Sequence, residues 1–328
     1  MKKYGVVATL ALLTLGTSAF AASPPGGDNF PVKSITAISP FGAGGGTDRS
    51  VRLAASVWKK YTPHNLRVVN MPGAGSSVGM KFTKEAPADG YTIVQNGSQM
   101  LTVPYFYSYE ETGWRLEEFE PIAIQQTISF VLAVPTDSPF KTLSDLVEFG
   151  RKNPGKIRHA SVGYGGDSHV AFKALEIVAG FTATVIPFDS GADQVANIAG
   201  GHVDAAIATS GTMLPLVRSG KARLLAVGTE KRVEAIKDIP TAKEQGIDWQ
   251  FINWRGWLAP PNTPKERVAY IADVLKKVCE DQEVISKIEN EGEIPEFYGP
   301  EEFKKYLEYA KTVYEPAIKA ILAEEKKK

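Results

Sequence analysis

A glycine-rich segment near the start of the chain has the residue types of an anion-binding loop. It reads Ser39-Pro-Phe-Gly-Ala-Gly-Gly-Gly-Thr-Asp48 and lies between a predicted strand at 34–39 and a predicted helix at 47–60. Its closely spaced glycines leave backbone N–H groups uncovered, and a helix that begins at Thr47 or Asp48 would add its positive end. The segment matches neither a P-loop nor a dinucleotide fingerprint. We therefore expect it to bind an anion, with a plain tight turn as the alternative.

Two further glycine clusters have the same placement between a predicted strand and a predicted helix. They are Met71-Pro-Gly-Ala-Gly-Ser-Ser-Val-Gly79 and Val162-Gly-Tyr-Gly-Gly-Asp-Ser-His169. Three such loops predict that several helix N-termini converge on one ligand. Backbone donors bind a carboxylate or a phosphate without a basic surface, which fits a chain with 37 Lys+Arg and 37 Asp+Glu.

An exported serine hydrolase is the alternative from another class. Gly75-Ser-Ser-Val-Gly79 matches the G-x-S-x-G elbow, with Ser77 as the nucleophile. An elbow places its serine directly after a buried strand, whereas Pro72 and Gly73 intervene here, and no spacing singles out a histidine base. The four histidines are scattered and have no metal-binding spacing. We therefore predict no catalytic residues, no metal site and no cofactor.

Strand and helix patterns alternate along the chain, which predicts an α/β fold with sheets covered on both faces. The predicted strands span 34–39, 66–70, 91–95, 130–134, 156–161, 184–187, 204–208 and 223–227. The predicted helices span 47–60, 77–85, 142–152, 168–179, 193–199, 213–219, 264–280 and 300–322. Two extended stretches, 130–135 and 249–260, are expected to cross between lobes. They divide the chain into domain 1 (30–131 and 254–328) and domain 2 (132–253).

Composition and the N-terminus indicate an exported globular protein. The 328 residues are 43% hydrophobic and 23% charged, which suits about two domains, and the balanced charge argues against a nucleic-acid binder. Residues 1–21 have the pattern of a secretory signal peptide: Lys2 and Lys3, an apolar stretch, then Ala19 and Ala21. Cys279 is the single cysteine, so no internal disulfide forms. These features predict a soluble periplasmic protein.

In these motifs the chain resembles the extracytoplasmic receptors of tripartite tricarboxylate transporters, also called Bug receptors. The resemblance covers nearly all of the mature chain and rests on motifs in the family's order. These are the segment 39–48 with Arg52, then 69–79, Ala88-Asp-Gly-Tyr-Thr92, 163–171, Phe188-Asp-Ser-Gly-Ala192, Gly200-Gly-His-Val-Asp204, 219–226 and Gly256-Trp-Leu-Ala-Pro-Pro-Asn-Thr-Pro264.

The resemblance implies a type II-like periplasmic binding-protein fold, with two α/β lobes, a central hinge and a ligand cleft. It implies a receptor, expected to be a monomer, that captures a small organic carboxylate and delivers it to the membrane subunits of a tripartite transporter. A receptor that reports to a sensor system is an alternative. The positions that match the family's ligand contacts are Phe41, Gly42, Ala43, Gly44, Gly45, Thr47, Ser76, Gly163, Tyr164, Gly165, Gly166, Asp167, Ser168, Ser190 and Gly191.

Two acidic residues depart from the family pattern. Asp167 stands where the family usually has a small residue, and Asp189 replaces a Tyr-Lys type pattern. A carboxylate at 167 repels an anion unless it turns toward N–H groups, and it can accept a hydrogen bond from a ligand hydroxyl or ammonium. The identity of the carboxylate ligand is therefore left open.

Overall fold

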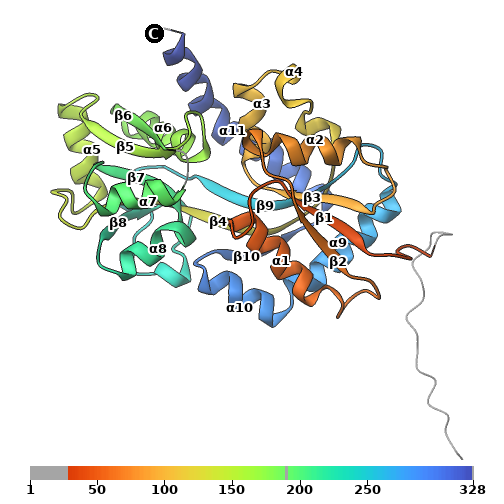
Figure 1. The fold of residues 1–328 in the computed structure, drawn as a ribbon. Coiled ribbons are helices and arrows are strands. Elements are labelled where there is room, and N and C mark those ends of the chain that lie inside the picture. Colours follow the sequence, from red (N-terminus) through yellow and green to blue (C-terminus); the bar gives the residue numbers. More distant parts are fainter. Residues whose placement is uncertain (1–28, 189–190, 327–328) are drawn as a thin grey trace, which may run out of the picture.

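The computed structural model describes residues 29–188 and 191–326. The predicted signal peptide, Asp189 and Ser190 lie outside the described residues. Strands and helices alternate as the sequence predicts (Figure 1). The strands are β1 (Ile35–Ser39), β2 (Leu66–Asn70), β3 (Thr92–Asn96), β4 (Glu120–Pro135), β5 (Ile157–Val162), β6 (Ala183–Phe188), β7 (Ala205–Thr209), β8 (Ala222–Val227), β9 (Ile252–Ala259) and β10 (Ile294–Tyr298). The helices are α1 (Gly46–Trp58), α2 (Ser77–Glu85), α3 (Gln99–Phe106), α4 (Tyr109–Thr112), α5 (Leu143–Lys152), α6 (Asp167–Ala179), α7 (Gly191–Ala199), α8 (Ser210–Arg218), α9 (Lys265–Cys279), α10 (Gln282–Asn290) and α11 (Pro300–Glu325).

Local sequence signals explain several of these elements. At the start of α5, the Thr142 hydroxyl accepts the Asp145 N–H at 3.1 Å, and the Asp145 carboxylate accepts the Thr142 N–H at 2.8 Å. This reciprocal pair is a capping box at the start of a helix that the sequence predicts. In α1 the apolar residues Val51, Ala54 and Trp58 recur at helical spacing and are fully buried. Burial of that face, rather than intrinsic propensity, holds a 13-residue helix in place.

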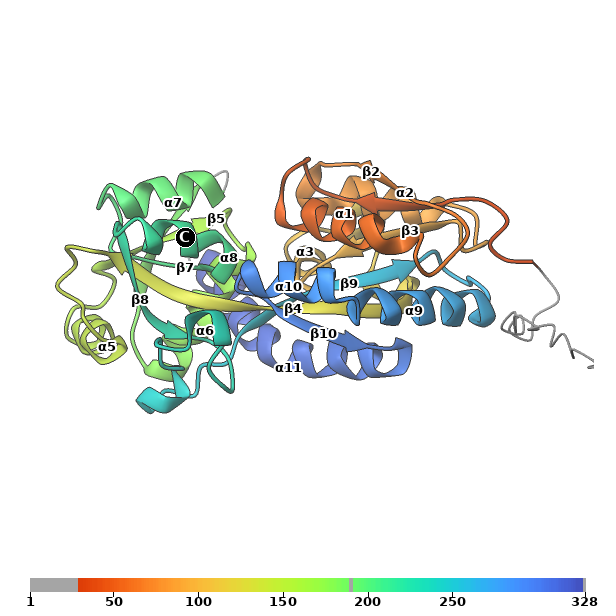
Figure 2. The ribbon, with the colours of Figure 1, turned by 90° about the horizontal axis from the view of Figure 1, so that it is seen from below.

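The long strand β4 is shared by the two halves of the molecule (Figure 2). Between residues 120 and 129 it pairs antiparallel with β9, and from 130 to 135 it pairs with β7 and β8. Parallel strands β1, β2 and β3 lie on the β9 side, whereas β5, β6 and β7 lie on the other side. The predicted domain boundaries at 131/132 and 253/254 fall near this change of partners, and the division into domains stays a prediction.

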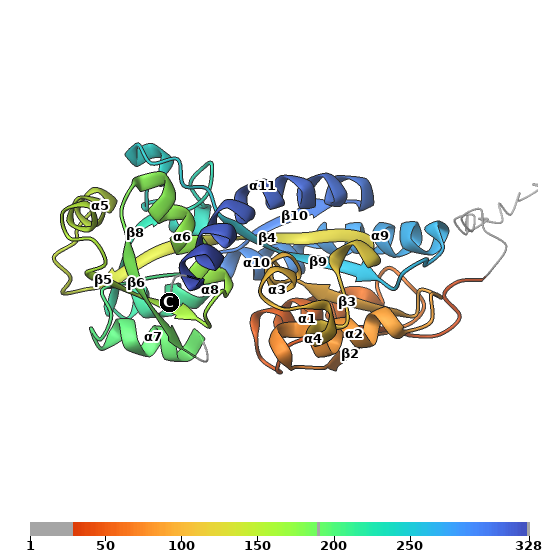
Figure 3. The same cartoon turned by 90° about the horizontal axis from the view of Figure 1, so that it is seen from above.

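The C-terminal helix α11 ties the halves together along one side (Figure 3). The Tyr314 hydroxyl donates to the Ile252 carbonyl at 2.9 Å, and Lys173 of α6 reaches Glu324 of α11 at 3.0 Å. Lys173 also pairs with the buried Glu176. The predicted α11 segment therefore extends past 322 and packs against the opposite half.

Several elements were not predicted from the sequence: helices α3, α4 and α10, strand β10 and the first ten residues of β4. Helix α3 is apolar almost throughout and contains Pro104, so it has no amphipathic pattern. The missed part of β4 contains Gln125, Gln126 and Thr127, which are buried polar residues that interrupt the apolar run. These elements matter because α3 and the turn after α10 line the site described next.

Candidate functional site

The loop 39–48 turns between β1 and the first residue of α1. Gly44 has φ +81°, which favours glycine, and its N–H donates to the Asp48 carboxylate at 2.8 Å. The predicted start of this helix at Thr47 or Asp48 is wrong, because α1 begins at Gly46 and its N-cap is Gly45, which has no side chain to cap with. Among the described residues, the N–H groups of Gly46, Thr47 and Asp48 have no protein acceptor. This end of α1 is therefore a source of free donors.

The carboxylate of Asp48 holds this loop in shape. It accepts hydrogen bonds from Arg52 at 3.0 Å, from Asn70 at 2.8 Å and from the Gly44 N–H. Burial acts to raise its pKa, but the hydrogen bonds from Arg52, Gly44 and Asn70 outweigh burial and keep the pKa below its ordinary value. Arg52, which the family motif includes, supports the loop from outside the cleft.

The loop 162–168 repeats this arrangement at the start of α6. The Ser168 hydroxyl accepts the Val162 N–H at 2.9 Å, and His169 Nδ1 accepts the Gly165 N–H at 3.0 Å. At Gly166 an added Cβ would lie 2.0 Å from the Val162 carbonyl oxygen, so only glycine fits. In the described part of the chain, the N–H groups of Gly166, Asp167 and Ser168 have no acceptor. A second helix N-terminus therefore has free donors.

Both helix N-termini line one cavity of about 490 Å³ between the two halves of the molecule. The predicted residues that line it are Phe41, Gly45, Thr47, Gly163, Tyr164, Gly165, Gly166, Asp167, Ser168 and Gly191. We call this cavity the cleft. Gly42, Ala43 and Gly44 lie on the exposed outer side of their loop and do not line it. Ser190 lies outside the described residues.

The loop 71–79 contributes less to the cleft than predicted. Gly75 lines the cleft, whereas Ser76 is buried beneath it and accepts a hydrogen bond from Asn96 at 3.1 Å. The Ser77 hydroxyl is buried in the first turn of α2 and has no hydrogen-bond partner among the described residues. A nucleophilic serine needs a base within hydrogen-bond reach, and Ser77 has none.

Sequence reasoning missed the other lining residues, which come mainly from α3, β4, β7, α8 and β9. They are Gly46, Arg49, Gln99, Thr102, Val103, Phe106, Tyr107, Phe130, Val162, Gln194, Ala208, Thr209, Thr212, Asn253, Arg255 and Glu293. Helix α3 supplies an apolar wall, and its Phe106 ring approaches Gly165 so closely that an added Cβ there would lie 2.9 Å from the ring. The cleft therefore combines aromatic walls with polar groups at its floor, as ligand sites commonly do.

Three buried charged residues form the floor: Asp167, Arg255 and Glu293. Burial raises the pKa of Asp167 to about 6, although the Ser98 hydroxyl and the Arg255 charge act to lower it. Burial also raises the pKa of Glu293, against the opposing effect of Arg255, and lowers the pKa of Arg255. A sequence signal for Arg255 existed, because it is a charged residue inside an apolar strand pattern.

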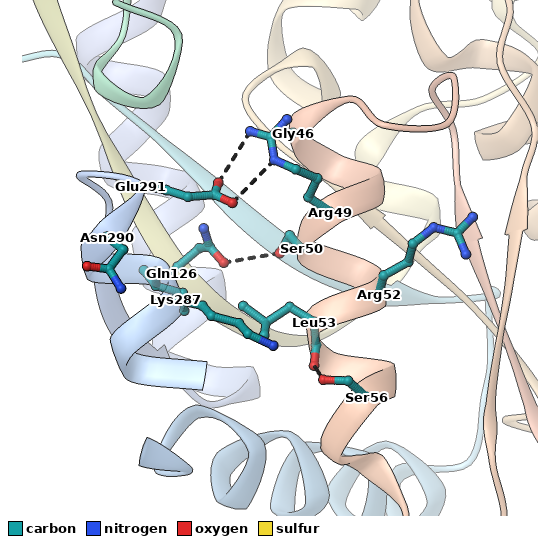
Figure 4. Close-up of a pocket in the computed structure, with 11 residues that line it drawn as sticks. Gly46, Arg49, Ser50, Arg52, Leu53, Ser56, Gln126, Lys287, Asn290 and Glu291 are labelled. Carbon is teal, nitrogen blue, oxygen red and sulfur yellow. Dashed lines mark hydrogen bonds and ion pairs between the residues drawn. The ribbon is translucent and has the colours of Figure 1, made fainter. Parts of the chain in front are cut away.

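A second hollow of about 470 Å³ lies beside the cleft, between α1 and α10 (Figure 4). There the Arg49 guanidinium donates to both carboxylate oxygens of Glu291 at 3.3 Å, and Ser50 donates to Gln126 at 3.1 Å. Arg49 reaches the cleft as well, but its charge is already paired.

Neither a metal centre nor a membrane span is found in the described part of the chain. Among the described residues, the His, Cys, Asp and Glu side chains form no group of three or more that is placed to bind a metal ion. Within residues 29–188 and 191–326, no helix has the length and apolar character that crossing a lipid bilayer requires.

Comparison with known proteins decides the family. Residues 51–319 match the model of the tripartite tricarboxylate transporter family receptor. The chain belongs to this receptor family. The receptor is 29% identical over 290 residues to a UPF0065 protein of Bordetella pertussis, with 88% of each chain covered. The predicted family and solute-binding function are thereby confirmed, and neither the hydrolase nor the sensor alternative gains support.

Solved structures agree with this assignment. A TctC solute-binding protein from Polaromonas aligns to the receptor with a TM-score of 0.76 and 27% identity, covering 89% of this chain and 99% of the other. Rpa4515 of R. palustris, solved with adipate, has a TM-score of 0.79 at 23% identity, covering 89% and 98%. The two-lobed α/β fold is confirmed by these neighbours. Receptors of this family are periplasmic.

Proposed function

We propose that this receptor binds a small organic carboxylate in the cleft and delivers it to the membrane subunits of a tripartite transporter. One observation carries the proposal: the N-termini of α1 and α6, from opposite halves of the chain, both line the cleft with N–H groups that have no acceptor in residues 29–188 and 191–326. Helix N-termini favour anions through these donors and through the helix dipole. The adipate in a structural neighbour supports a carboxylate as the ligand class.

The available donors are sufficient for a useful affinity. A micromolar complex needs about −8 kcal/mol. A hydrogen bond to a charged group contributes about 1.5–3 kcal/mol. Four or five of the N–H groups at positions 46–48 and 166–168 therefore supply this energy and offset the costs of desolvation and closure.

The remaining features of the proposal follow from the family and the site. Residues 1–21 are removed on export, the receptor acts as a periplasmic monomer, and it performs no chemistry, since Ser77 has no base. Ligand capture closes the two halves by bending near residues 129–130 of β4 and near Asn253 of β9, where the chain crosses between the halves.

The test begins with thermal-shift screening against mono-, di-, tricarboxylic and aromatic acids, followed by calorimetry on each acid that binds. Thr47→Pro removes the backbone N–H of a residue that lines the cleft. Thr47 is in the first turn of α1, so the substitution breaks no hydrogen bond within the helix. We expect a ten- to hundredfold weaker complex, from the loss of one such hydrogen bond. Glu266→Pro, at the same position of α9, is the matched control and should bind normally.

Two outcomes would overturn the proposal. If no carboxylate in the panel shifts the melting temperature or gives a heat of binding, the ligand class is wrong. If Thr47→Pro binds as the wild type does, the α1 N-terminus is not the anion site. Small-angle scattering with and without the bound acid tests closure, and unchanged dimensions would argue against hinge bending.

A further inference from the structure

Arg255 is a buried cation at the floor of the cleft. The charges of Glu293 and Asp167 act on it, but neither carboxylate is within ion-pair distance. It is 8% exposed, its Nε has no acceptor, and no described carboxylate forms an ion pair with it. Its guanidinium lies between the start of α1 and the turn after β3. A Cβ added to Gly46 would lie 2.7 Å from Nη2 of Arg255, and a Cβ added to Gly97 would lie 3.2 Å from Nη1. A buried guanidinium with no direct ion pair and an unbonded Nε is costly, so this group points to an anion supplied by the ligand.

Asp167 has the complementary property. It is 9% exposed, and its Oδ2 accepts hydrogen bonds from Ser98 at 2.5 Å and from Asn253 at 3.3 Å. Its Oδ1 is buried and accepts no hydrogen bond among the described residues, although the Thr102 hydroxyl lies near enough to help lower the pKa of the carboxyl. Because a carboxylate oxygen only accepts, the partner of Oδ1 must be a donor, such as a hydroxyl or an ammonium group.

The charges around the cleft disfavour a ligand that is an acceptor at both ends. Arg49 and Arg255 are balanced by Asp167 and Glu293 among the lining residues, and Arg49 is already paired with Glu291. A second ligand carboxylate near Asp167 would meet a like charge in a poorly solvated place. The aromatic rings of the walls, by contrast, suit an apolar body between the two ends of the ligand.

We propose that Arg255 binds the carboxylate of the ligand and that Asp167 Oδ1 accepts a hydrogen bond from a hydroxyl or ammonium group of the same molecule. This deepens the proposed function and rests on it. The receptor then selects hydroxy- or amino-carboxylates over acids without a donor. Discrimination of this kind is strong, because an acid without the donor leaves the buried Oδ1 of Asp167 without a hydrogen bond.

Two matched series of acids test the selectivity in the full mature chain. One series is butanoate, 4-hydroxybutanoate and 4-aminobutanoate, and the other is 4-methylbenzoate, 4-(hydroxymethyl)benzoate and 4-(aminomethyl)benzoate. Within each series the three acids differ only in having hydrogen, hydroxyl or ammonium at the same carbon. Comparing the hydroxyl acid with the ammonium acid shows which kind of donor the receptor prefers. By calorimetry at pH 7.5, we expect a donor-bearing acid to bind at least about tenfold more tightly than its parent.

Three variants assign the two roles. Asp167→Asn keeps an oxygen for Ser98 and turns an amide donor toward the ligand, so the preference should reverse in favour of the parent acid. Arg255→Gln should weaken every acid by at least about tenfold, and Arg255→Lys, which keeps the charge, should recover part of the loss. Arg223→Gln, which lies outside the cleft and contacts backbone carbonyls at 3.2–3.3 Å, is the control and should not change binding.

The outcomes separate this inference from the proposed function. If the parent acids bind as tightly as their donor-bearing partners, and Asp167→Asn leaves that ratio unchanged, the selectivity is refuted while carboxylate binding stands. If Arg255→Gln is folded by circular dichroism and binds normally, Arg255 is not the anchor. Failure of every acid, in these series and in the wider panel, would instead count against the proposed function.

Discussion

Ionisation of Asp167 should make the ligand-free receptor less stable as the pH rises. The side chain lies at the start of α6 and is 9% exposed, and within the described part of the chain only its Oδ2 accepts hydrogen bonds. Burial raises its pKa from the ordinary 3.8 to about 6, despite the opposing effects of the Ser98 hydroxyl and of Arg255. The folded protein therefore holds this proton more tightly than the unfolded chain does.

The sign and size of the effect follow from this difference in pKa. The stabilising contribution of the bound proton is fully present below pH 3.8 and is lost as the pH rises through about 6. Because a tenfold difference in proton affinity is worth about 1.36 kcal/mol, the loss at pH 7.5 is about 3 kcal/mol. Asp167→Asn cannot ionise and has nearly the same shape. Its free energy of unfolding should exceed that of the wild type at pH 7.5, and the gap should shrink by about 2 kcal/mol at pH 4.5.

Urea unfolding of the ligand-free protein, followed by tryptophan fluorescence at both pH values, measures this gap. Asp137→Asn, at an exposed turn, is the control and should track the wild type at each pH. A gap that is equal at pH 4.5 and 7.5, or a wild type that is the more stable protein at pH 7.5, would refute the reasoning.

Three other predictions test the loops and the framework. Gly166→Ala forces a Cβ to within 2.0 Å of a carbonyl oxygen, so it should abolish binding and lower the melting temperature, whereas Gly42→Ala has open space and should unfold as the wild type does. A fluorophosphonate probe should leave Ser77 unlabelled, since its buried hydroxyl has no base, and labelling that Ser77→Ala abolishes would revive the hydrolase alternative. Lys173→Met leaves the buried Glu176 carboxylate without its ion-pair partner and should lower the free energy of unfolding by about 3 kcal/mol. The double variant Lys173→Met, Glu176→Leu removes both charges and should recover most of this loss.

The sequence was sufficient to predict the α/β class and the loops that carry the helix N-termini. Glycine clusters between strand and helix patterns located the loops at 39–48 and 162–168, because glycine is the residue that frees backbone donors there. The prediction failed at the N-cap of α1, where Asp48 holds the loop from inside the first turn instead of capping the helix. Local sequence alone does not distinguish these two uses of an acidic residue.

The charged floor was missed for a different reason. Arg255 lies between the buried tryptophans of β9. A single charged residue in such an apolar pattern indicates a buried charge that has a functional role. Glu293 gives no comparable signal, since it follows α10, a short helix that itself was not predicted. Arg255 and Asp167 lie far apart in the sequence and come near each other only in the folded protein, where both line the cleft.

Stability and selectivity meet in the same groups. A receptor optimised only for folding would place a small or apolar residue at 167 and would not bury Arg255 without a direct ion pair, because both charges destabilise the ligand-free protein. A ligand that carries both a carboxylate and a donor compensates Arg255 and Asp167 at once. A ligand that carries only one of these groups leaves the other buried residue uncompensated, so it binds more weakly. The energetic cost of the ligand-free floor is thus the source of its discrimination, which is how activity and stability oppose each other at many functional sites.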